Sequence, residues 1–248
     1  MKILVCISHV PDTTSKINFA NSDTIFDTNG VQFVINPNDE FGLTRAIWFK
    51  EKNGDQVTVI NVGEADTEPT LRKALAIGAD EAVRVNAQPT DSFFVASQLA
   101  DAIKNGGYDL IITGKESIDY NGGVVPGMIA ALTGMNFVNG CIGLEVENGQ
   151  ATIVREIDGG KETLSASLPL IVAVQKGVVE EKDLRIPNMR GIMTARQKAL
   201  TVLESNGVSA QSKVVKFDKP APKSAVKMVA ASNLDELIEL LHKEAKVI

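Results

Sequence analysis

The chain has 248 residues, enough for one large α/β domain or for one domain with an extension. Its hydrophobic content of 44%, with 23% charged residues, is ordinary for a globular protein in water. A net charge of −6 and a pI near 5.1 argue against nucleic acid or an acidic membrane as the main partner. No stretch approaches the ~20 apolar residues of a membrane span, and the start lacks the pattern of a signal peptide. We therefore expect a cytoplasmic protein.

The side chains that most often carry out catalysis are scarce. Cys6 and Cys141 are too few and too far apart for a zinc or iron–sulfur site, so we expect them to be buried and reduced. His9 and His242 are the only histidines, which leaves no convincing Ser-His-Asp or Cys-His constellation. We therefore predict no catalytic residue and no metal site in this chain.

The first 135 residues predict strands that alternate with amphipathic helices. We expect strands at residues 2–10, 57–62, 82–85 and 110–113, helices beginning near residues 36, 67, 91 and 126, and a hairpin over residues 22–35 with its turn at Asp27-Thr28-Asn29-Gly30. This alternation implies right-handed crossovers and a parallel sheet with helices on both faces. The expected class is therefore a doubly wound, mainly parallel α/β fold.

The pattern changes after residue 140. Strands are expected at residues 144–147, 151–156, 162–167 and 170–174, with turns at Asn148-Gly149 and Asp158-Gly159-Gly160, which predicts an antiparallel region. Residues 205–231 read as an arm containing Ser, Lys and Pro. A helix capped by Asn233 follows it, with an apolar stripe of Leu234, Leu237, Ile238 and Leu241. We therefore divide the chain into an α/β domain at 1–200 and an arm with a helix at 201–248, which either folds back or docks on a partner.

Residues 109–134 are the stretch best suited to bind a ligand. A buried strand ends at Gly114, a loop carries Gly122 and Gly123, and Pro126 opens a helix. The first N–H groups of such a helix and its dipole can hold a phosphate, and glycines let the backbone approach closely. An ordinary strand-to-helix turn is the competing interpretation. Both the Walker A loop and the dinucleotide fingerprint are absent, because Glu116 follows Lys115 and no glycine follows the first strand.

A longer pattern resembles a known family. Residues 153–164 join a basic residue, an acidic-glycine turn and an acidic residue, and Pro169 then precedes an apolar strand; this run resembles the signature of the electron transfer flavoprotein beta subunit. Four further stretches resemble that family in the same order, at residues 10–13, 36–40, 74–80 and 114–119. Residues 185–189 and 191–196 resemble its partner-recognition loop and following helix. The resemblance covers about residues 1–200. The arm and its helix resemble the family only in their general type.

The resemblance implies a Rossmann-like fold of the adenine-nucleotide-binding type and a subunit that carries electrons rather than an enzyme in its own right. It implies a heterodimer with an alpha subunit, whose FAD accepts electrons from acyl-CoA dehydrogenases or similar flavin dehydrogenases and passes them on. In this subunit it implies AMP, or a second FAD in the electron-bifurcating branch. By position, the cofactor-binding residues would be Cys6, Asn36, Asn38, Asp39, Val62, Gly114, Lys115, Glu116, Ser117, Ile118, Asp119, Gly122, Gly123, Val124 and Val125.

The resemblance also implies residues that face partners. Arg155 and Glu156 would lie where the flavin domain of the alpha subunit approaches, and Arg185, Met189, Ile192 and Met193 would form the recognition loop and helix. After Asp119 the sequence has neither the Asn-Gln-Thr of many AMP-binding members nor the Gly-Asp-Thr of many bifurcating ones, so AMP and FAD both stay open. The alternative functions are a non-redox adenine-nucleotide-binding module and an adenylating enzyme, although the latter would want a glycine-serine loop after the first strand.

Overall fold

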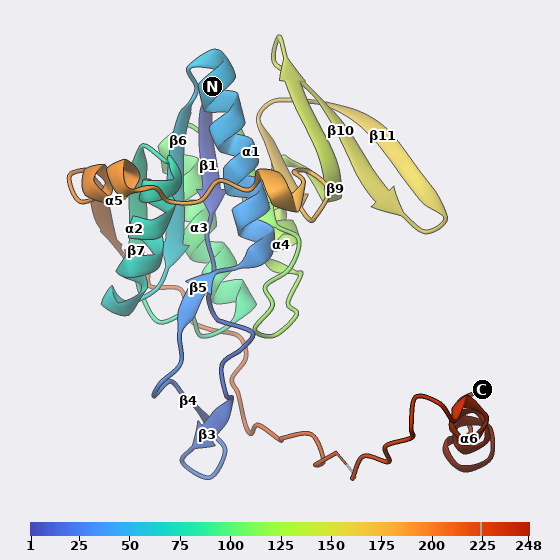
Figure 1. Ribbon diagram of the computed structural model, residues 1–248. Helices are drawn as coiled ribbons and strands as arrows, with labels where there is room; N and C mark the ends of the chain where they lie inside the picture. The colour runs from blue at the N-terminus through green and yellow to red at the C-terminus, as the bar shows by residue number, and fades with distance from the viewer. Residues whose placement is uncertain (224) are drawn as a thin grey trace.

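A central sheet organises the molecule, which is a computed structural model that describes residues 1–223 and 225–248. Within these residues the sheet has nine strands in the order β11-β10-β9-β12-β8-β1-β6-β7-β13. Its parallel part consists of β1 (Lys2–Cys6), β6 (Gln56–Val62), β7 (Glu81–Asn86), β8 (Leu110–Gly114), β12 (Leu170–Val174) and β13 (Leu200–Glu204). Figure 1 shows β1 and β6 upright in the middle of the molecule.

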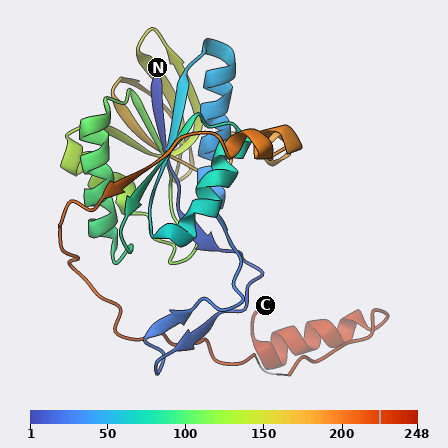
Figure 2. The same ribbon diagram turned by 90° about the vertical axis from the view of Figure 1, so that its left-hand side faces the viewer.

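Helices cover both faces of this parallel part, as Figure 2 shows. One face carries α1 (Pro37–Asn53), α2 (Glu68–Ile77) and the short α5 (Met189–Ala195), and the other carries α3 (Ser92–Gly106) and α4 (Val125–Thr133). Two short 3₁₀ turns, η1 (Ala65–Thr67) and η2 (Glu181–Asp183), lie in connecting segments. The doubly wound α/β fold predicted from the sequence is therefore confirmed.

The central strand β1 explains why its sequence is apolar without alternation. Ile3 and Val5 pack into the core under α1 and α2, whereas Leu4 packs into the core under α3 and α4. All three side chains are fully buried. A strand that is covered on both faces needs apolar residues at consecutive positions, because successive side chains point to opposite faces.

The antiparallel part of the sheet consists of β9 (Asn136–Glu147), β10 (Gln150–Ile157) and β11 (Gly160–Ser167). The predicted turn at Asn148-Gly149 is confirmed, and both residues have positive φ, +50° and +78°, as a tight hairpin turn requires. Strand β9 is longer than predicted, because its first half pairs in parallel with β12 and its second half pairs with β10. It thereby joins the two parts of the sheet.

The predicted hairpin over residues 22–35 is wrong. Instead β3 (Asn18–Ala20) pairs with β4 (Ile25–Asp27), and β2 (His9–Pro11) pairs with β5 (Phe33–Ile35). The turn between β3 and β4 lies at residues 21–24, where three consecutive non-glycine residues have positive φ. Asp27 and Asn29 do form a turn, closed by the Asn29 N–H donating to Asp27 Oδ1 at 3.1 Å, but this turn connects β4 to β5 without pairing them. Residues 2–10, predicted as one strand, accordingly divide into β1 and β2.

The sequence analysis did not predict β13, the last strand of the sheet. The chain leaves the sheet only after this strand. Beyond Glu204 an extended arm runs past the β3–β4 hairpin to α6 (Leu234–Glu239), which continues as a π-helical turn η3 (Leu240–Ala245). The predicted cap is confirmed, since the Glu236 N–H donates to Asn233 Oδ1. Figures 1 and 2 show this helix standing away from the sheet, so it does not fold back. Among the described residues, no helix has the length and apolar character needed to cross a membrane.

Candidate functional site

The candidate site lies at the carboxyl ends of β1, β6 and β8. Strands β6 and β8 lie on opposite sides of β1 in the sheet. The crossovers that follow β1 and β7 therefore lead to opposite sides of β1, and the strand order reverses there. Ligands of open parallel sheets bind at such a topological switch point. The segments that follow these strands are 7–8, 63–64 and the loop 115–124, which lead from the sheet into β2, η1 and α4.

Asp39 ties two of these segments together. It lies in the first turn of α1 and is only 2% exposed. Its Oδ2 accepts a hydrogen bond from the Ser8 N–H at 2.7 Å, and its Oδ1 accepts one from the Gly114 N–H at 2.8 Å. Burial raises the pKa of Asp39 to about 7, although the hydrogen bonds from Ser8, Asn36 and Gly114 oppose this shift. The carboxyl group therefore links the segment after β1 to the end of β8.

Two asparagines hold the start of the loop 115–124. The Asn36 side chain donates to the Glu116 carbonyl at 2.9 Å and accepts from the Ile118 N–H at 3.2 Å. Asn38 donates to the same carbonyl at 3.3 Å. These hydrogen bonds connect residues about 80 positions apart in the sequence. They occupy the side-chain amides of both asparagines. Asn36 and Asn38 therefore fix the loop backbone at Glu116 and Ile118.

The middle of the loop closes on itself. The Ser117 N–H donates to the Gly122 carbonyl at 3.1 Å, and Asp119 Oδ1 accepts from the Ser117 hydroxyl at 2.6 Å and from the Tyr120 N–H at 2.8 Å. Asn121 takes a positive φ of +51° to complete the turn. The Asp119 carboxylate is thus occupied within the loop, and Lys115 is the single basic residue between residues 109 and 134.

The two glycines of the loop differ in their surroundings. A Cβ atom on Gly122 would meet nothing within 4 Å, whereas one on Gly123 would lie 3.1 Å from the Lys115 carbonyl oxygen. Neither glycine has a positive φ. Gly123 is therefore required by the close approach of two loop segments, and Gly122 leaves open space on the loop surface.

The two ends of the loop, at β8 and at α4, carry polar groups without a hydrogen-bond partner among the described residues. Val124 caps α4 without a side-chain hydrogen bond, and Pro126 contributes no N–H of its own. Beside Gly114, the Thr113 hydroxyl is buried and has no partner among the residues that the structure describes. Free N–H groups at a helix start and a spare hydroxyl are the groups that bind a phosphate. The residues present therefore fit a nucleotide phosphate.

Cys6 and Val62 form part of the apolar floor under the site. Both are buried in the core beneath α3 and α4. Burial raises the pKa of the Cys6 thiol far above its ordinary value, and the nearby Asp39 charge adds to this effect. Cys6 is therefore an inert thiol at neutral pH, and Cys141 is likewise a free, buried cysteine.

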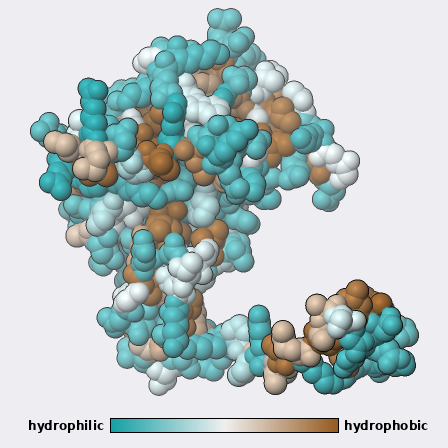
Figure 3. Space-filling model, viewed as in Figure 1, coloured by the Kyte–Doolittle hydropathy of each residue, from teal (hydrophilic) through white to brown (hydrophobic). Residues whose placement is uncertain are grey.

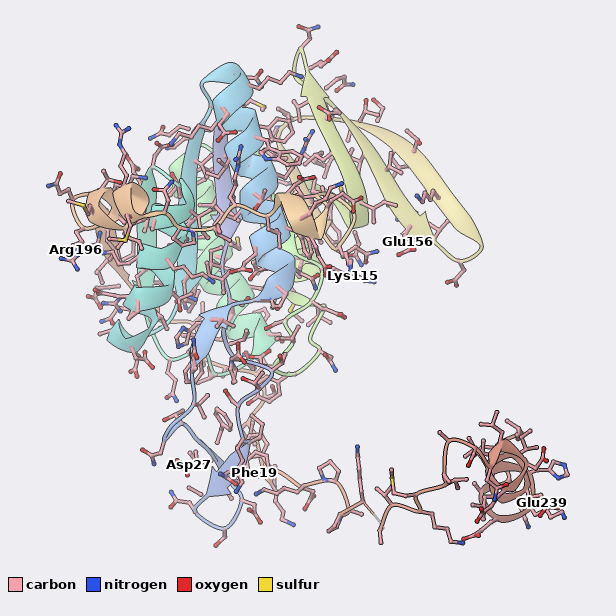
Figure 4. All side chains as sticks on the ribbon, in the orientation of Figure 1. Phe19, Asp27, Lys115, Glu156, Arg196 and Glu239 are labelled. Atoms are coloured by element: carbon pink, nitrogen blue, oxygen red, sulfur yellow. The ribbon has the colours of Figure 1, made fainter. Side chains whose placement is uncertain are left out.

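The residues predicted to face partners lie in two separate places. Arg155 and Glu156 are on β10, where the Arg155 guanidinium donates to Glu162 at 2.6 Å and the Gln175 amide donates to exposed Glu156 at 2.6 Å. Figure 4 shows Glu156 and Arg196 on opposite sides of the molecule, with Lys115 between them. The structure thus brings the residues predicted to bind a cofactor to one edge of the sheet and keeps the two predicted partner-facing sets apart.

Met189 lies in a helix, whereas the resemblance placed it at the end of the recognition loop at residues 185–189. It is the first residue of α5, which Asn188 caps by accepting from the Gly191 N–H at 2.8 Å. Met189 is 75% exposed, and Ile192 and Met193 on the same helix are exposed too. Gly191 lets α5 approach α2 closely, because a Cβ atom there would lie 2.3 Å from the Ala76 carbonyl oxygen.

Arg185 marks the other end of this apolar surface. Its guanidinium pairs with Glu51 on α1 at 2.6 Å, and its N–H donates to the Thr44 hydroxyl. A shallow hollow beside it has a mixed lining, with the apolar Trp48, Ile77, Leu184 and Ile186 among charged and polar residues such as Glu51, Lys182 and Asp183. Asn188, which caps α5, also lines this hollow, so the exposed side chains of α5 begin next to it.

Sequence reasoning missed two residues of the site, Ser8 and Thr113. Ser8 acts through its backbone N–H, which no residue pattern can reveal. Thr113 was assigned only to a buried strand, yet its unpartnered hydroxyl lies two residues before the loop. A polar side chain near the carboxyl end of an otherwise apolar parallel strand is the signal that would have identified it.

Comparisons with known proteins identify the family of the chain. The family model described as "Electron transfer flavoprotein domain" matches residues 23–207. The chain is 32% identical to the electron transfer flavoprotein subunit beta of Bacillus subtilis, with both chains covered completely. It is 33% identical to that of Syntrophomonas wolfei, over 91% of this chain and 88% of the relative, and 31% identical to the mitochondrial one of Arabidopsis thaliana over both full lengths. The chain therefore belongs to the family of electron transfer flavoprotein beta subunits.

Proposed function

We propose that this protein is the beta subunit of a heterodimeric electron transfer flavoprotein and that it binds an adenine nucleotide in the pocket between β1, β8 and α4. The observation that carries the proposal is the loop 115–124, whose start is held by Asn36 and Asn38 and which leads into the start of α4, where no side chain caps the helix. Asp39 fixes Gly114, the residue just before this loop. A phosphate placed there would receive N–H groups and the positive end of the helix dipole. The chain supplies binding and orientation, and it does so without catalytic side chains of its own.

The nucleotide is AMP or a second FAD. The ribose and adenine would extend from the phosphate toward Cys6 and Val62, whose apolar surface suits a stacked or buried base. The space beside Gly122 is open, so this part of the loop favours neither the smaller AMP nor the larger FAD. The shared adenosine phosphate is therefore the part of the ligand that the pocket residues recognise.

The redox role belongs to a flavin held with the alpha subunit. When bound, the FAD accepts electrons from a flavin dehydrogenase, such as an acyl-CoA dehydrogenase, and passes them on. In this proposal Glu156 and Arg155 face the flavin-bearing part of the alpha subunit, while Met189, Ile192 and Met193 with Arg185 bind the dehydrogenase. The separation of these two sets on the surface supports the proposal, because two partners can then bind at once.

One preparation tests these statements together. The chain is produced with its alpha subunit, and the purified pair is examined by absorbance before its nucleotides are released by denaturation and counted. We expect flavin bands near roughly 370 and 450 nm, which the flavin itself sets, and one extra AMP or FAD per pair. A nucleotide without any flavin would instead favour the non-redox binding module, and adenylate turnover without flavin would favour the adenylating enzyme.

A further inference from the structure

The arm after β13 is attached to the body of the protein at two places before it runs free. Its root is held at α3, and its middle is held at the β3–β4 hairpin. Beyond these places, every hydrogen bond and ion pair found for residues 225–248 stays within that segment. The arm is therefore fixed as far as residue 219 and has no partner afterwards among the described residues.

Helix α3 holds the root of the arm through two side chains. Asp91 caps the helix by accepting from the Phe94 N–H at 2.7 Å through Oδ1, while its Oδ2 accepts from the N–H groups of Gln211 and Ser212, each at 2.6 Å. The buried Gln98 amide donates to Asn206 Oδ1 at 2.5 Å and accepts from the Asn206 N–H at 2.9 Å. One carboxylate thus serves both the helix and the arm.

The hairpin holds the middle of the arm. Phe217 stacks on Phe19 with ring centroids 4.6 Å apart and planes within 4° of parallel. The Phe217 N–H donates to the Asp23 carbonyl at 2.7 Å, and Lys219 donates to Asn18 Oδ1 at 3.1 Å. Figure 4 shows Phe19 on the hairpin, well separated from Glu239 on the terminal helix. The hairpin lies outside both hydrophobic cores, so hairpin and arm support each other.

The free end carries the apolar surface that needs a partner. Leu234 and Ile238 are 63% and 55% exposed, and Leu237 and Met228 are exposed beside them. Figure 3 shows hydrophobic residues gathered on this terminal segment, away from the body of the molecule. A helix of this length is not stable alone in water without a surface to bury its stripe.

We propose that Asp91 and the Phe19–Phe217 stack form a clamp that aims the terminal helix at the alpha subunit, which makes these three side chains positioning residues for assembly of the heterodimer. The inference rests on the proposed function, because it names that alpha subunit as the partner. A tethered helix binds as if at high local concentration, and this concentration falls when the tether can swing widely. Loosening the clamp therefore weakens assembly although no clamp residue touches the partner.

Two substitutions loosen the clamp selectively in the full-length chain. Asp91→Asn keeps an oxygen to cap α3 but turns an NH₂ group toward the N–H groups of Gln211 and Ser212. Phe19→Leu removes the aromatic stack. Asp101→Asn, an exposed aspartate on the same helix, and Ile25→Ala, an exposed apolar residue on the same hairpin, are the matched controls. Phe19→Tyr keeps the stack and should behave as the wild type.

The first measurement is cleavage of the full-length chain by a lysine-specific protease. We expect faster cleavage after Lys213 in Asp91→Asn and after Lys216 and Lys219 in Phe19→Leu, with both controls cut at the wild-type rate. The second measurement is the dissociation constant for the alpha subunit, which we expect to rise ~10-fold in each clamp variant as the local concentration falls. Thermal unfolding should stay near that of the wild type, since neither residue lies in a hydrophobic core.

A double-mutant cycle separates aiming from direct contact. Leu237→Asp disrupts the apolar stripe of the terminal helix, so a clamp substitution added to it should weaken binding no further. A fully additive loss would show that the clamp residues touch the partner themselves and would overturn the proposal. It would also be overturned by clamp variants that are cleaved faster but bind the alpha subunit as tightly as the wild type does. If the wild type itself failed to bind an alpha subunit, the proposed function would fail, and the clamp proposal with it.

Discussion

At the scale of single residues, Asp39 is the group whose ionisation matters most for the pocket. Its carboxyl is buried beneath the loop and holds the Ser8 and Gly114 N–H groups. Burial raises its pKa from an ordinary value of 3.8 to about 7. The folded state therefore binds this proton more tightly than the unfolded state does, so the stability that Asp39 contributes is complete below pH ~4 and decreases as the pH rises toward 7.

The direction of this pH dependence of stability can be measured with the variant Asp39→Asn. The variant loses one acceptor and should be ~1–3 kcal/mol less stable than the wild type at pH 4–5, because a buried N–H is left unpaired. Between pH 4 and 7 this difference should shrink, by at most ~1.4 kcal/mol per pH unit. In this range Asp39 ionises in the unfolded wild-type chain but stays protonated in the folded one, so only the wild type loses stability. Chemical unfolding across this range, with Asp101→Asn as the exposed control, checks it. A difference that stays constant or grows with pH would contradict the raised pKa.

Gly123 is the residue on which the shape of the pocket depends most directly. A Cβ atom at this position would lie 3.1 Å from the Lys115 carbonyl, so Gly123→Val should push the two loop segments apart. We expect the variant to fold and to lose most of its bound nucleotide, because the displaced backbone no longer faces α4 correctly. Nucleotide release after denaturation measures this. Gly122→Ala, in open space, is the matched control, and wild-type nucleotide content in Gly123→Val would show that the loop does not depend on this contact.

At the scale of elements, the β10–β11 hairpin presents Glu156 to solvent. Its hydrogen bond to Gln175 is exposed, so Glu156→Ala should cost at most ~1 kcal/mol of stability. If Glu156 faces the flavin-bearing part of the alpha subunit, the substitution should change the rate of electron transfer and its dependence on salt. Stopped-flow kinetics at two ionic strengths provides the test, with Glu147→Ala on the neighbouring strand as control. A large fall in melting temperature with unchanged kinetics would assign Glu156 a structural role instead.

Helix α5 presents Met189 in the same way. The side chain is 75% exposed, so Met189→Ala leaves no cavity and should not change the melting temperature measurably. A flexible thioether beside the hollow near Arg185 can fill pockets of different shapes. We therefore expect weaker coupling to the dehydrogenase, while chemical reduction of the flavin stays normal. Ile17→Ala, another exposed apolar residue, is the control, and undiminished coupling in Met189→Ala would exclude this residue as the anchor.

The elements also show where sequence reasoning succeeds. Strands such as β1 and β8 were predictable because a strand buried on both faces needs a continuous apolar run, and few other structures tolerate one. Helices α1 to α4 were predictable from periodic apolar residues and from their Pro and Gly boundaries. The hairpin at residues 22–35 failed because turn chemistry at Asp27 to Gly30 shows that the chain bends, and does not show which strands pair across the bend. The turn of the β3–β4 hairpin has Asn21, Ser22 and Asp23 in left-handed conformations. It contains no glycine that would have signalled these conformations in the sequence.

At the scale of the whole molecule, the sequence by itself determined the class of fold and the family. Apolar runs that alternate with amphipathic helices leave few arrangements other than a doubly wound sheet, and the ordered match over residues 1–200 identified the beta subunits of electron transfer flavoproteins. The same match named Asn36, Asp39 and Gly114 as pocket residues. It did not reveal what they do, since their partners are 75 to 82 residues away in the chain.

Only the tertiary structure decided the contacts between distant segments. Strand β13 has mostly exposed side chains and was not predicted, yet it completes the sheet because its backbone pairs with β7. Asp91 reads as an ordinary helix cap, and only the folded chain brings Gln211 and Ser212 to its second oxygen. Local patterns record burial and turns, which depend on neighbours in sequence. Pairing of backbone groups and stacking such as that of Phe19 on Phe217 depend on neighbours in space, and no periodicity in the sequence encodes them.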